Sequence, residues 1–239
     1  MKLLKETDSP QSTHGRWYED ACGTAFAMEL IGERWAMLIL RELMLGGRRF
    51  SDLRAALPAI SAKVLTERLA RLEAEGIVLR RKLPPPAATQ VYELTEWGYL
   101  AEPAIRELGR WAARSPRHDP RLPLSPVSLM LSMRTMLVPE AAEGFAARIG
   151  FAVAGEEFVA ELAGGQLLIR RGEASEGDAL FRMAAPLPLL RLIYGHQRLE
   201  DVEADGGLAV EGNRELARRF AGCFSLPPKI APPHSGPDC

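Results

Sequence analysis

Apolar residues recur at helical spacing in a short stretch of the N-terminal half, with polar residues on the opposite side. Three leucines stand at positions i, i+4 and i+7, which places them on one face of a helix. They are Leu65, Leu69 and Leu72. Ser61 is suited to cap the start of this helix, and Gly76 is suited to the left-handed position that ends it. The pattern predicts a helix from Ser61 to about Glu75.

A shorter helix is predicted just before it, over residues 52–57. Ser51 stands in the position of an N-cap, and Asp52 places negative charge at the positive end of the helix. Pro58 ends it, because the residue before a proline is disfavoured in the α region. Two helices joined by so tight a turn predict a helix-turn-helix. In that motif the N-terminal part of the second helix enters the DNA major groove.

The flanking residues predict a helical scaffold and a two-stranded wing. Helical spacing is present over residues 20–31 and again over 35–43, where Glu42 is the polar member of an otherwise apolar stripe. Strands are predicted over residues 77–83 and 90–94, because both segments are rich in β-branched and apolar residues. A proline-rich tip joins them and completes the wing.

Ordered blocks of residues follow one another along this half. They are WAMLILREL at 35–43, GRRFS at 47–51, LR at 53–54, ISAKVLTERL at 60–69, LE at 72–73, EG at 75–76 and YELTEWG at 92–98. Together they resemble the HxlR family of bacterial winged helix-turn-helix transcription regulators, over about residues 20–113. The resemblance implies that this half binds double-stranded operator DNA.

A further helix is predicted from Thr95 to Trp111, and Pro103 within it predicts a break or a kink. In the HxlR family this helix and the N-terminal one form the dimer interface, so the resemblance implies a homodimer. Two half-sites in the major groove also require two recognition helices. Simple packing onto the core of the same subunit is the alternative for this helix.

Basic charge is concentrated around the predicted helix-turn-helix, although the whole chain has a net charge of −1. Residues 41–90 contain ten Lys and Arg against five Asp and Glu, whereas residues 126–239 contain eleven against fifteen. A local excess of this kind is what contact with phosphates requires. The expected DNA contacts on the two helices and the wing are Arg48, Arg49, Ser51, Arg54, Ser61, Lys63, Thr66, Arg71, Arg80, Arg81 and Lys82.

Four prolines in residues 115–126 predict a stiff linker to a second domain. Beyond it, short apolar runs punctuated by glycines predict strands. The strands are expected at 145–153, 156–162, 166–171, 179–183 and 208–211, and helices at 128–137, 186–194, 197–203 and 214–224. This order predicts an α+β domain with a mostly antiparallel sheet.

The order of these elements and glycines resembles the sterol carrier protein type two domain over about residues 128–226. The resemblance implies an apolar cavity between sheet and helices that takes a lipid-like or other apolar small molecule. The candidate lining residues are Phe158, Leu168, Phe181, Leu189, Leu190, Ile193 and Tyr194. The sequence leaves open which sheet face is inward, and whether each residue is an ordinary core residue instead.

The predicted fold class is α+β, with an N-terminal winged helix-turn-helix that is mostly helical and a C-terminal sterol-carrier-like domain. The predicted boundaries are a flexible N-terminus at 1–15, the DNA-binding and dimerisation domain at 16–114, the linker at 115–126, the ligand-binding domain at 127–226 and a disordered tail at 227–239.

The sequence contains none of the motifs G-x-S-x-G, H-E-x-x-H, C-x-x-C, G-x-G-x-x-G or the P-loop. It therefore predicts a protein that is not an enzyme and uses no metal and no cofactor. Acidic residues cluster between 200 and 205, where a solvated face is favoured over a cation site. The lack of a signal peptide and of long apolar runs favours a cytoplasmic protein with reduced thiols and no membrane partner.

Cys22 stands where the HxlR family commonly has a cysteine, and some members sense redox state. No basic residue is adjacent to lower its pKa, so an inert thiol is favoured over a redox-active one.

These observations predict a homodimeric transcription regulator that reads a pseudo-palindromic operator with the helix at 61–75 and the wing at 77–94. The C-terminal domain would bind an apolar effector. The alternative is a lipid-binding or carrier protein whose winged helix is only a protein-interaction module, and the basic region argues against it.

Overall fold

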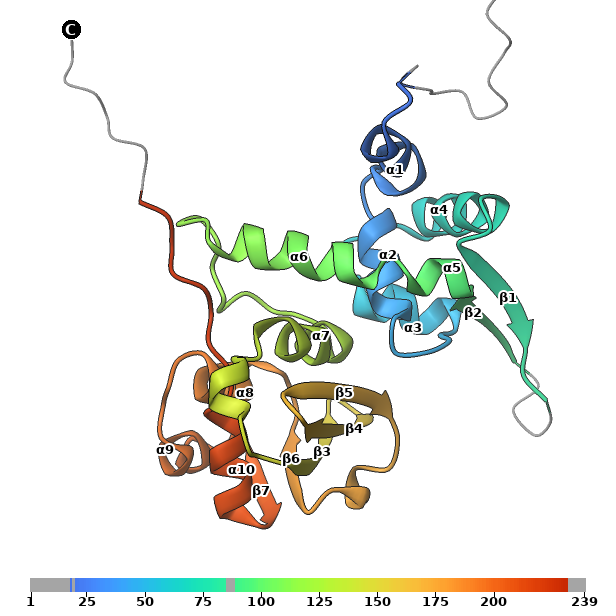
Figure 1. Cartoon of the computed structure of the whole chain (residues 1–239). Helices are drawn as coiled ribbons and strands as arrows, with labels where there is room; N and C mark the ends of the chain where they lie inside the picture. Colours follow the sequence, from blue (N-terminus) through green and yellow to red (C-terminus); the bar gives the residue numbers. More distant parts are fainter. Residues whose placement is uncertain (1–17, 19, 85–88, 232–239) are drawn as a thin grey trace, which may run out of the picture.

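The computed structural model describes residue 18, residues 20–84 and residues 89–231. Figure 1 shows an N-terminal half of helices with a projecting β-hairpin, and a C-terminal half in which helices flank a sheet. The elements of the N-terminal half are α1 (Gly23–Ile31), α2 (Ala36–Leu43), α3 (Phe50–Ala56), α4 (Ala62–Ala74), β1 (Val78–Lys82), β2 (Gln90–Leu94), α5 (Glu96–Tyr99) and α6 (Glu102–Ala113). The predicted flexible segment at 1–15 lies outside the described residues.

The predicted helix-turn-helix is present as α3 and α4. Ser61 caps α4, since its Oγ accepts a hydrogen bond from the Val64 N–H at 3.2 Å. The three leucines of the apolar stripe are buried, and Gly76 has a φ of +71° just beyond the helix. The prediction for Ser51 is wrong, because α3 begins at Phe50, two residues earlier than predicted, and its N-cap is Arg49.

The predicted wing is formed by β1 and β2, which pair antiparallel from Val78 opposite Leu94 to Lys82 opposite Gln90. The tip residues 85–88 lie outside the described part of the chain. Pro103 stands in the first turn of α6, where a missing N–H costs nothing, and the chain breaks between α5 and α6 just before it. The expected break is therefore confirmed.

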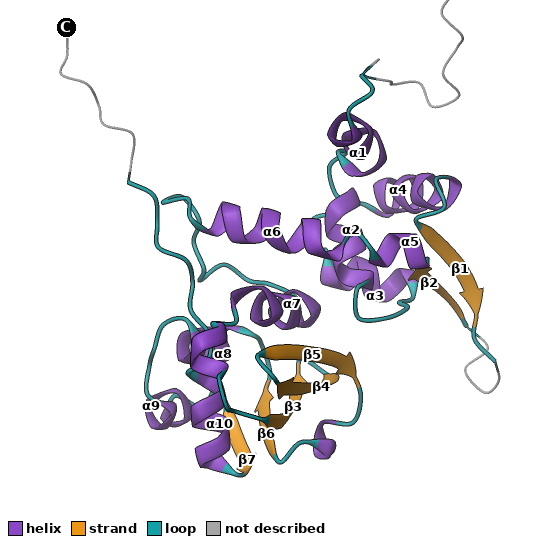
Figure 2. Ribbon diagram, viewed as in Figure 1, coloured by secondary structure: helices purple, strands orange, loops and turns teal. Residues whose placement is uncertain are grey.

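The C-terminal half is a mixed sheet with helices, as Figure 2 shows. Its elements are α7 (Pro126–Met136), η1 (Pro139–Ala142), β3 (Ala147–Val153), β4 (Glu156–Ala163), β5 (Gln166–Arg171), η2 (Ala174–Glu176), β6 (Ala179–Met183), α8 (Leu187–Ile193), α9 (Leu199–Ala204), β7 (Ala209–Gly212) and α10 (Arg214–Ala221). The strand order is β5-β4-β3-β6-β7. The β3–β6 pair is parallel and the other pairs are antiparallel, which agrees with the prediction of a mostly antiparallel sheet.

One sheet face carries the apolar interior. Phe151 lies between Phe158 and Phe181 on neighbouring strands, and its ring centroid is 6.0 Å from that of Phe220 on α10. The connection that contains η2 crosses the other face. There, a Cβ on Gly150 would overlap the carbonyl oxygen of Ala174, so only glycine allows this crossing.

The two halves share a continuous core. Buried side chains of α2, α3 and α4 belong to the same apolar cluster as those of α7 and the sheet. Helix α7 lies between α6 and β5 and contacts both (Figure 1). The predicted linker ends earlier than expected, because Ser125 caps α7 and Pro126 is already helical.

Residues 227–231 lie in the segment predicted as a disordered tail, but they return to the N-terminal half. Lys229 Nζ donates to the carbonyl of Ala113 at 2.8 Å, and the Ile230 N–H donates to the carbonyl of Arg114 at 2.9 Å. An ammonium is favourable at these otherwise open carbonyls at the C-terminus of α6. This contact corrects the prediction for the described part of the tail.

None of the helices within the described ranges is both long enough and apolar enough to cross a membrane.

Candidate nucleic-acid interface

The exposed face of α4 carries polar side chains near the N-terminus of the helix. The side chain of Lys63 is 86% exposed and has only the distant carboxylate of Glu67, at 4.0 Å, as an ion-pair partner. Thr66 is exposed, and its Oγ1 donates to the carbonyl of Ala62 at 3.0 Å. Ser61 is also exposed, although its hydroxyl already caps the helix. This face leaves Lys63 free to reach a phosphate or a base edge.

Arg71 was expected on the same surface but faces α1. Its Nη1 lies 2.7 Å from Glu33 Oε1, and its Nη2 lies 2.7 Å from the carbonyl oxygen of Glu29. A guanidinium held by a carboxylate and a carbonyl has little freedom to bind DNA. The assignment of Arg71 to DNA is therefore corrected: it fastens α4 to the chain before α2.

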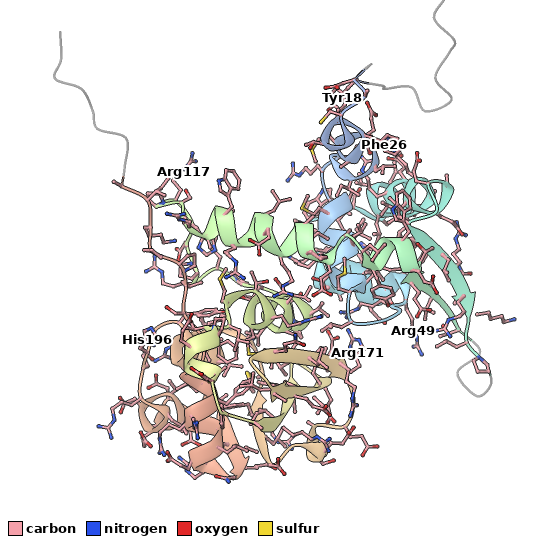
Figure 3. All side chains as sticks on the ribbon, viewed as in Figure 1. Tyr18, Phe26, Arg49, Arg117, Arg171 and His196 are labelled. Atoms are coloured by element: carbon pink, nitrogen blue, oxygen red, sulfur yellow. The ribbon has the colours of Figure 1, made fainter. Side chains whose placement is uncertain are left out.

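Helix α3 and the residue that caps it add exposed basic groups. Arg49 and Arg54 are both exposed, and Figure 3 shows Arg49 near the base of the wing. Ser51 is exposed as well, and its Oγ donates to Asp52 Oδ1 at 3.1 Å. Asp52 in turn accepts the Arg49 N–H at 3.2 Å, which fixes the first turn of the helix.

The wing presents three basic side chains in sequence on β1. Arg80 Nη2 pairs with Glu73 of α4 at 2.8 Å, and its guanidinium lies over the ring of Tyr92 at 5.6 Å. Arg81 Nη2 pairs with Glu93 at 2.8 Å, while Lys82 is exposed. The arginine side chains are 46% and 54% exposed, so both stay accessible to a phosphate despite their partners.

Arg48 was also expected to hold the DNA backbone, and this expectation is wrong. It is 7% exposed, and its guanidinium pairs with Glu42 and with Glu156 of the C-terminal half. The sequence gives Arg48 the same appearance as Arg49, and the ion pair to a residue 108 positions away decides the difference. The sequence feature that could have predicted the burial of Arg48 is Glu42, a carboxylate in an apolar stripe, because a buried carboxylate needs a partner.

Cys22 is exposed at the start of α1. Hydrogen bonds from the backbone N–H groups of Thr24 and Ala25, and from the Thr24 side chain, lower the pKa of its thiol. The sequence shows no adjacent basic residue, and the lower pKa of Cys22 comes instead from the first helical turn. Burial raises the pKa of Cys223, whose Sγ lies 3.5 Å from the carbonyl oxygen of Ala141.

The candidate ligand-lining residues of the C-terminal half fall into two groups. Six of them are buried or half-buried on the helix-covered side of the sheet: Phe158, Phe181, Leu189, Leu190, Ile193 and Tyr194. Leu168 is 61% exposed, because alternate residues of β5 face opposite sides and the inward ones are Leu167 and Ile169. Leu168 therefore does not line the interior.

A polar pair lies within this apolar interior. The hydroxyl of Tyr194 is 2.7 Å from that of Ser132 on α7. Burial raises the pKa of Tyr194, so this phenol stays neutral and available for hydrogen bonding.

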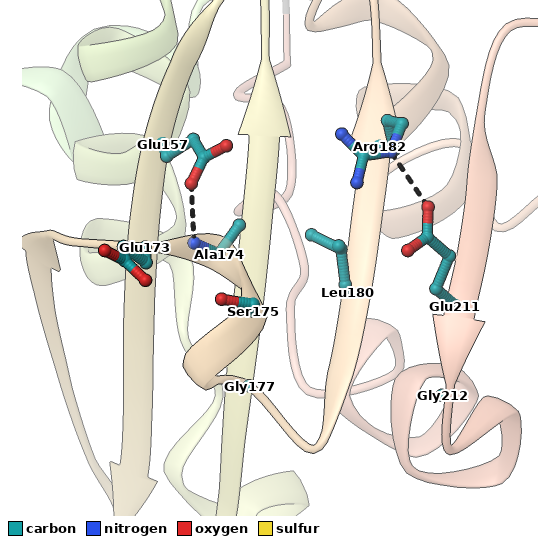
Figure 4. A pocket seen from close by; sticks show the side chains of 9 residues that line it. All are labelled: Glu157, Glu173, Ala174, Ser175, Gly177, Leu180, Arg182, Glu211 and Gly212. Carbon is teal, nitrogen blue, oxygen red and sulfur yellow. Dashed lines mark hydrogen bonds and ion pairs between the residues drawn. The ribbon is translucent and has the colours of Figure 1, made fainter.

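Surface hollows of the C-terminal half lie away from these residues. One, of about 410 Å³, is open on the face crossed by η2 and is lined by Glu157, Glu173, Ala174, Ser175, Gly177, Leu180, Arg182, Glu211 and Gly212 (Figure 4). Arg182 Nε donates to Glu211 at 2.8 Å across it.

The acidic run at 200–205 is paired with arginines. Glu200, Glu203 and Asp205 each form an ion pair, and no group of three or more metal-binding side chains is found in the described residues.

Comparison with known proteins finds relatives of the N-terminal half. The HxlR-like helix-turn-helix family model matches residues 30–119. The HTH-type transcriptional regulators YvaP and YodB of Bacillus subtilis are each 41% identical to the chain over 86 residues, which is 36% of this chain and 80% and 77% of theirs. The regulator sll1512 of Synechocystis is 38% identical over 106 residues, or 44% of this chain and 78% of its own.

Solved structures match a similar share of the chain. Quinone-bound YodB from B. subtilis is 37% identical, with a TM-score of 0.33, over 37% of this chain and 93% of its own. The redox regulator HypR in its oxidized form is 32% identical, with a TM-score of 0.36, over 38% and 94%.

The family match thus covers the residues that build α2 to α6, which include the capped α4 and the basic wing. The relatives quoted are transcription regulators and not enzymes. The chain belongs to the HxlR-like helix-turn-helix family of transcription regulators.

Proposed function

We propose that this protein is a homodimeric transcription regulator that reads a pseudo-palindromic operator with α4 and holds the flanking backbone with α3 and the wing. The observation that carries the proposal is the exposed polar face of the Ser61-capped helix, with Lys63 at its N-terminal end. Exposed Arg49, Arg54 and the basic residues of β1 lie on the adjacent elements. Such an arrangement combines base contact from one helix with phosphate contact from both sides.

The dimer is proposed to form through α6 together with α1. Helix α6 packs against α7 on one side, yet it leaves Leu108 43% and Trp111 73% exposed. On α1 none of the residues is buried, and Met28 is 37% exposed. Exposed aromatic and aliphatic side chains on a helix that ends a DNA-binding domain favour burial against a second copy. Two recognition helices would then be set about one or two turns of the duplex apart, at about 34 Å for each turn.

The C-terminal half is proposed to be a sterol-carrier-like domain that binds an apolar small molecule. Its helices and one sheet face enclose an apolar interior, and Tyr194 with Ser132 supplies a polar pair within it. Pockets for such ligands are mostly apolar with a few placed polar groups. An effector changes DNA binding only if it prefers one conformation of the protein over another.

DNA binding is tested by fluorescence anisotropy with operator fragments selected by the full-length protein from random duplexes. We expect affinity to fall steeply with salt, because bound Lys and Arg displace counterions from phosphates. Lys63→Ala should weaken binding, whereas Arg198→Ala, which removes a comparably exposed cation from the C-terminal half, should not. A salt-independent affinity, or equal effects of the two variants, would contradict the proposal and favour a carrier whose winged helix binds protein.

A further inference from the structure

Arg48 is held by both halves of the protein. Its backbone N–H and C=O each bond to Tyr92 at 2.8 Å, which adds one β-bridge along the edge of β2 that faces away from β1. Its side chain points the other way: Nη2 lies 3.0 Å from Glu156 Oε1, and Nη1 lies 3.5 Å from Glu42 Oε2. Glu156 is the first residue of β4. A single residue therefore connects the wing to the start of β4, an inner strand of the C-terminal sheet.

Both carboxylates around Arg48 are fixed by additional donors. Glu42 has no exposed surface, and its Oε1 accepts from Ser125 Oγ at 2.6 Å and from Arg41 Nη2 at 2.8 Å. Glu156 Oε2 accepts from Arg171 Nη1 at 2.7 Å. These charge-assisted hydrogen bonds hold both carboxylates, and through them the Arg48 guanidinium, in one position.

The backbone around Arg48 is also closely packed against the wing. A Cβ on Gly47 would lie 3.3 Å from Val91 Cγ2 and 3.4 Å from the Tyr92 carbonyl oxygen. Little space therefore separates the loop before α3 from β2. A displacement of Arg48 is transmitted directly to β2 because packed segments of this kind do not yield continuously.

The connection through Arg48 links the wing, proposed to contact DNA, to the apolar interior of the C-terminal half, proposed to bind a ligand. On the wing, the ring of Tyr92 lies under the guanidinium of Arg80, one of the expected phosphate contacts. In the C-terminal half, Arg171 lies over the ring of Phe158 at 5.0 Å, and Phe158 is fully buried in the apolar interior. Each contact is a cation–π interaction, which favours one position of the cation over the ring.

We propose that the C-terminal domain positions the wing for DNA through the ion pair between Arg48 and Glu156. Arg48 is a positioning residue in this arrangement, since it is buried and acts through Tyr92. Movement of β4 on ligand binding would change the position of Arg48 and, with it, the order of the wing. The inference rests on the proposed function of DNA binding, but its first test does not require DNA.

The test compares Glu156→Gln with Glu161→Gln in the full-length protein. Glu161 lies on the same strand, but it faces the opposite side of the sheet, where it pairs with Arg148 at 3.2 Å. Each substitution removes one carboxylate charge that pairs with arginine: Glu156 pairs with Arg48 and Arg171, and Glu161 pairs with Arg148. Hydrogen exchange of the wing residues 78–82 and 90–94 is measured without DNA, with the unfolding midpoint recorded for each variant. Arg48→Lys serves as a second variant that keeps the buried charge.

We expect Glu156→Gln and Arg48→Lys to accelerate exchange in the wing, while Glu161→Gln leaves it unchanged. DNA affinity should fall about five- to tenfold for the first two variants only, within the range of ordinary coupling between sites. Wild-type exchange in the wing of folded Glu156→Gln would overturn the inference, even if the wild-type protein binds DNA. Failure of the wild-type protein to bind any duplex would overturn the proposed function separately.

Discussion

Ser125 Oγ donates a hydrogen bond to Glu42 Oε1 at 2.6 Å. A hydroxyl at the end of the linker therefore binds a carboxylate in the last turn of α2, 83 positions earlier. The same hydroxyl accepts the Ser128 N–H at 3.0 Å and caps α7. Glu42 has no exposed surface, and a buried carboxylate is costly unless its oxygens are bonded. Ser125 therefore stabilises both a helix and a buried charge between the two halves.

Ser125→Ala should lower the free energy of unfolding by about 3 kcal/mol, since it removes an N-cap and a hydrogen bond to a charged group. Ser61→Ala is the matched control, because Ser61 caps α4 in the same way but contacts no carboxylate. It should cost about 1 kcal/mol. Urea unfolding of both variants measures the difference. Equal losses would mean that the Glu42 bond contributes nothing.

Gly150→Ala should destabilise the C-terminal half by about 3 kcal/mol, because the added methyl group meets the backbone of Ala174, which cannot rotate away. Gly109→Ala is the control, since the residue is inside α6 and, apart from its chain neighbours and the backbone of its own helix, no heavy atom lies within 4 Å of the place its Cβ would occupy. That variant should gain about 0.5–1 kcal/mol from helix propensity. Thermal unfolding distinguishes these opposite signs.

Cys22 should react with iodoacetamide at lower pH than Cys223 does. The first turn of α1 lowers the pKa of Cys22, so its thiolate accumulates earlier as the pH rises, whereas burial raises the pKa of Cys223. Mass spectrometry of Cys239→Ser protein, alkylated between pH 6 and 9 (roughly the thiol range), measures both rates. The order should disappear in urea, and an identical pH dependence in the native state would contradict the expectation.

Trp111→Glu should convert the dimer to a monomer, because a charge replaces an exposed aromatic side chain at the proposed interface. Leu168→Glu places the same charge on a residue that is 61% exposed on β5, a strand that α7 separates from α6. Sedimentation velocity of both variants decides the matter. Loss of the dimer in Leu168→Glu alone would move the interface to the sheet.

Local patterns predicted most elements of this fold. The apolar stripe with Ser61 and Gly76 predicted α4 to within one residue at its end, and short apolar runs punctuated by glycines predicted the bounds of β5 and β6. These features depend on neighbours within a few positions, which the sequence displays directly. The helices after the linker were also predicted close to their observed bounds.

Partners that are distant in sequence were not predictable. Arg48 and Arg71 look like surface cations until Glu156 and Glu33 are brought to them by the fold. Leu168 was misplaced because a single strand does not reveal which of its faces is covered. The excess of basic residues around α4 was correct for the region, but it could not identify the two arginines that pair with distant carboxylates inside the protein.

The return of Lys229 to the carbonyl of Ala113, 116 positions earlier, has a consequence for synthesis on the ribosome. When α6 first emerges, the chain that closes its C-terminal end has not been made, and neither has the hydroxyl that bonds Glu42. The nascent N-terminal half must wait for translation to pass both segments before its scaffold is complete. Premature termination after α6 would release a chain in which Glu42 keeps Arg41 and Arg48 but lacks its hydroxyl partner, and in which the C-terminal carbonyls of α6 lack Lys229.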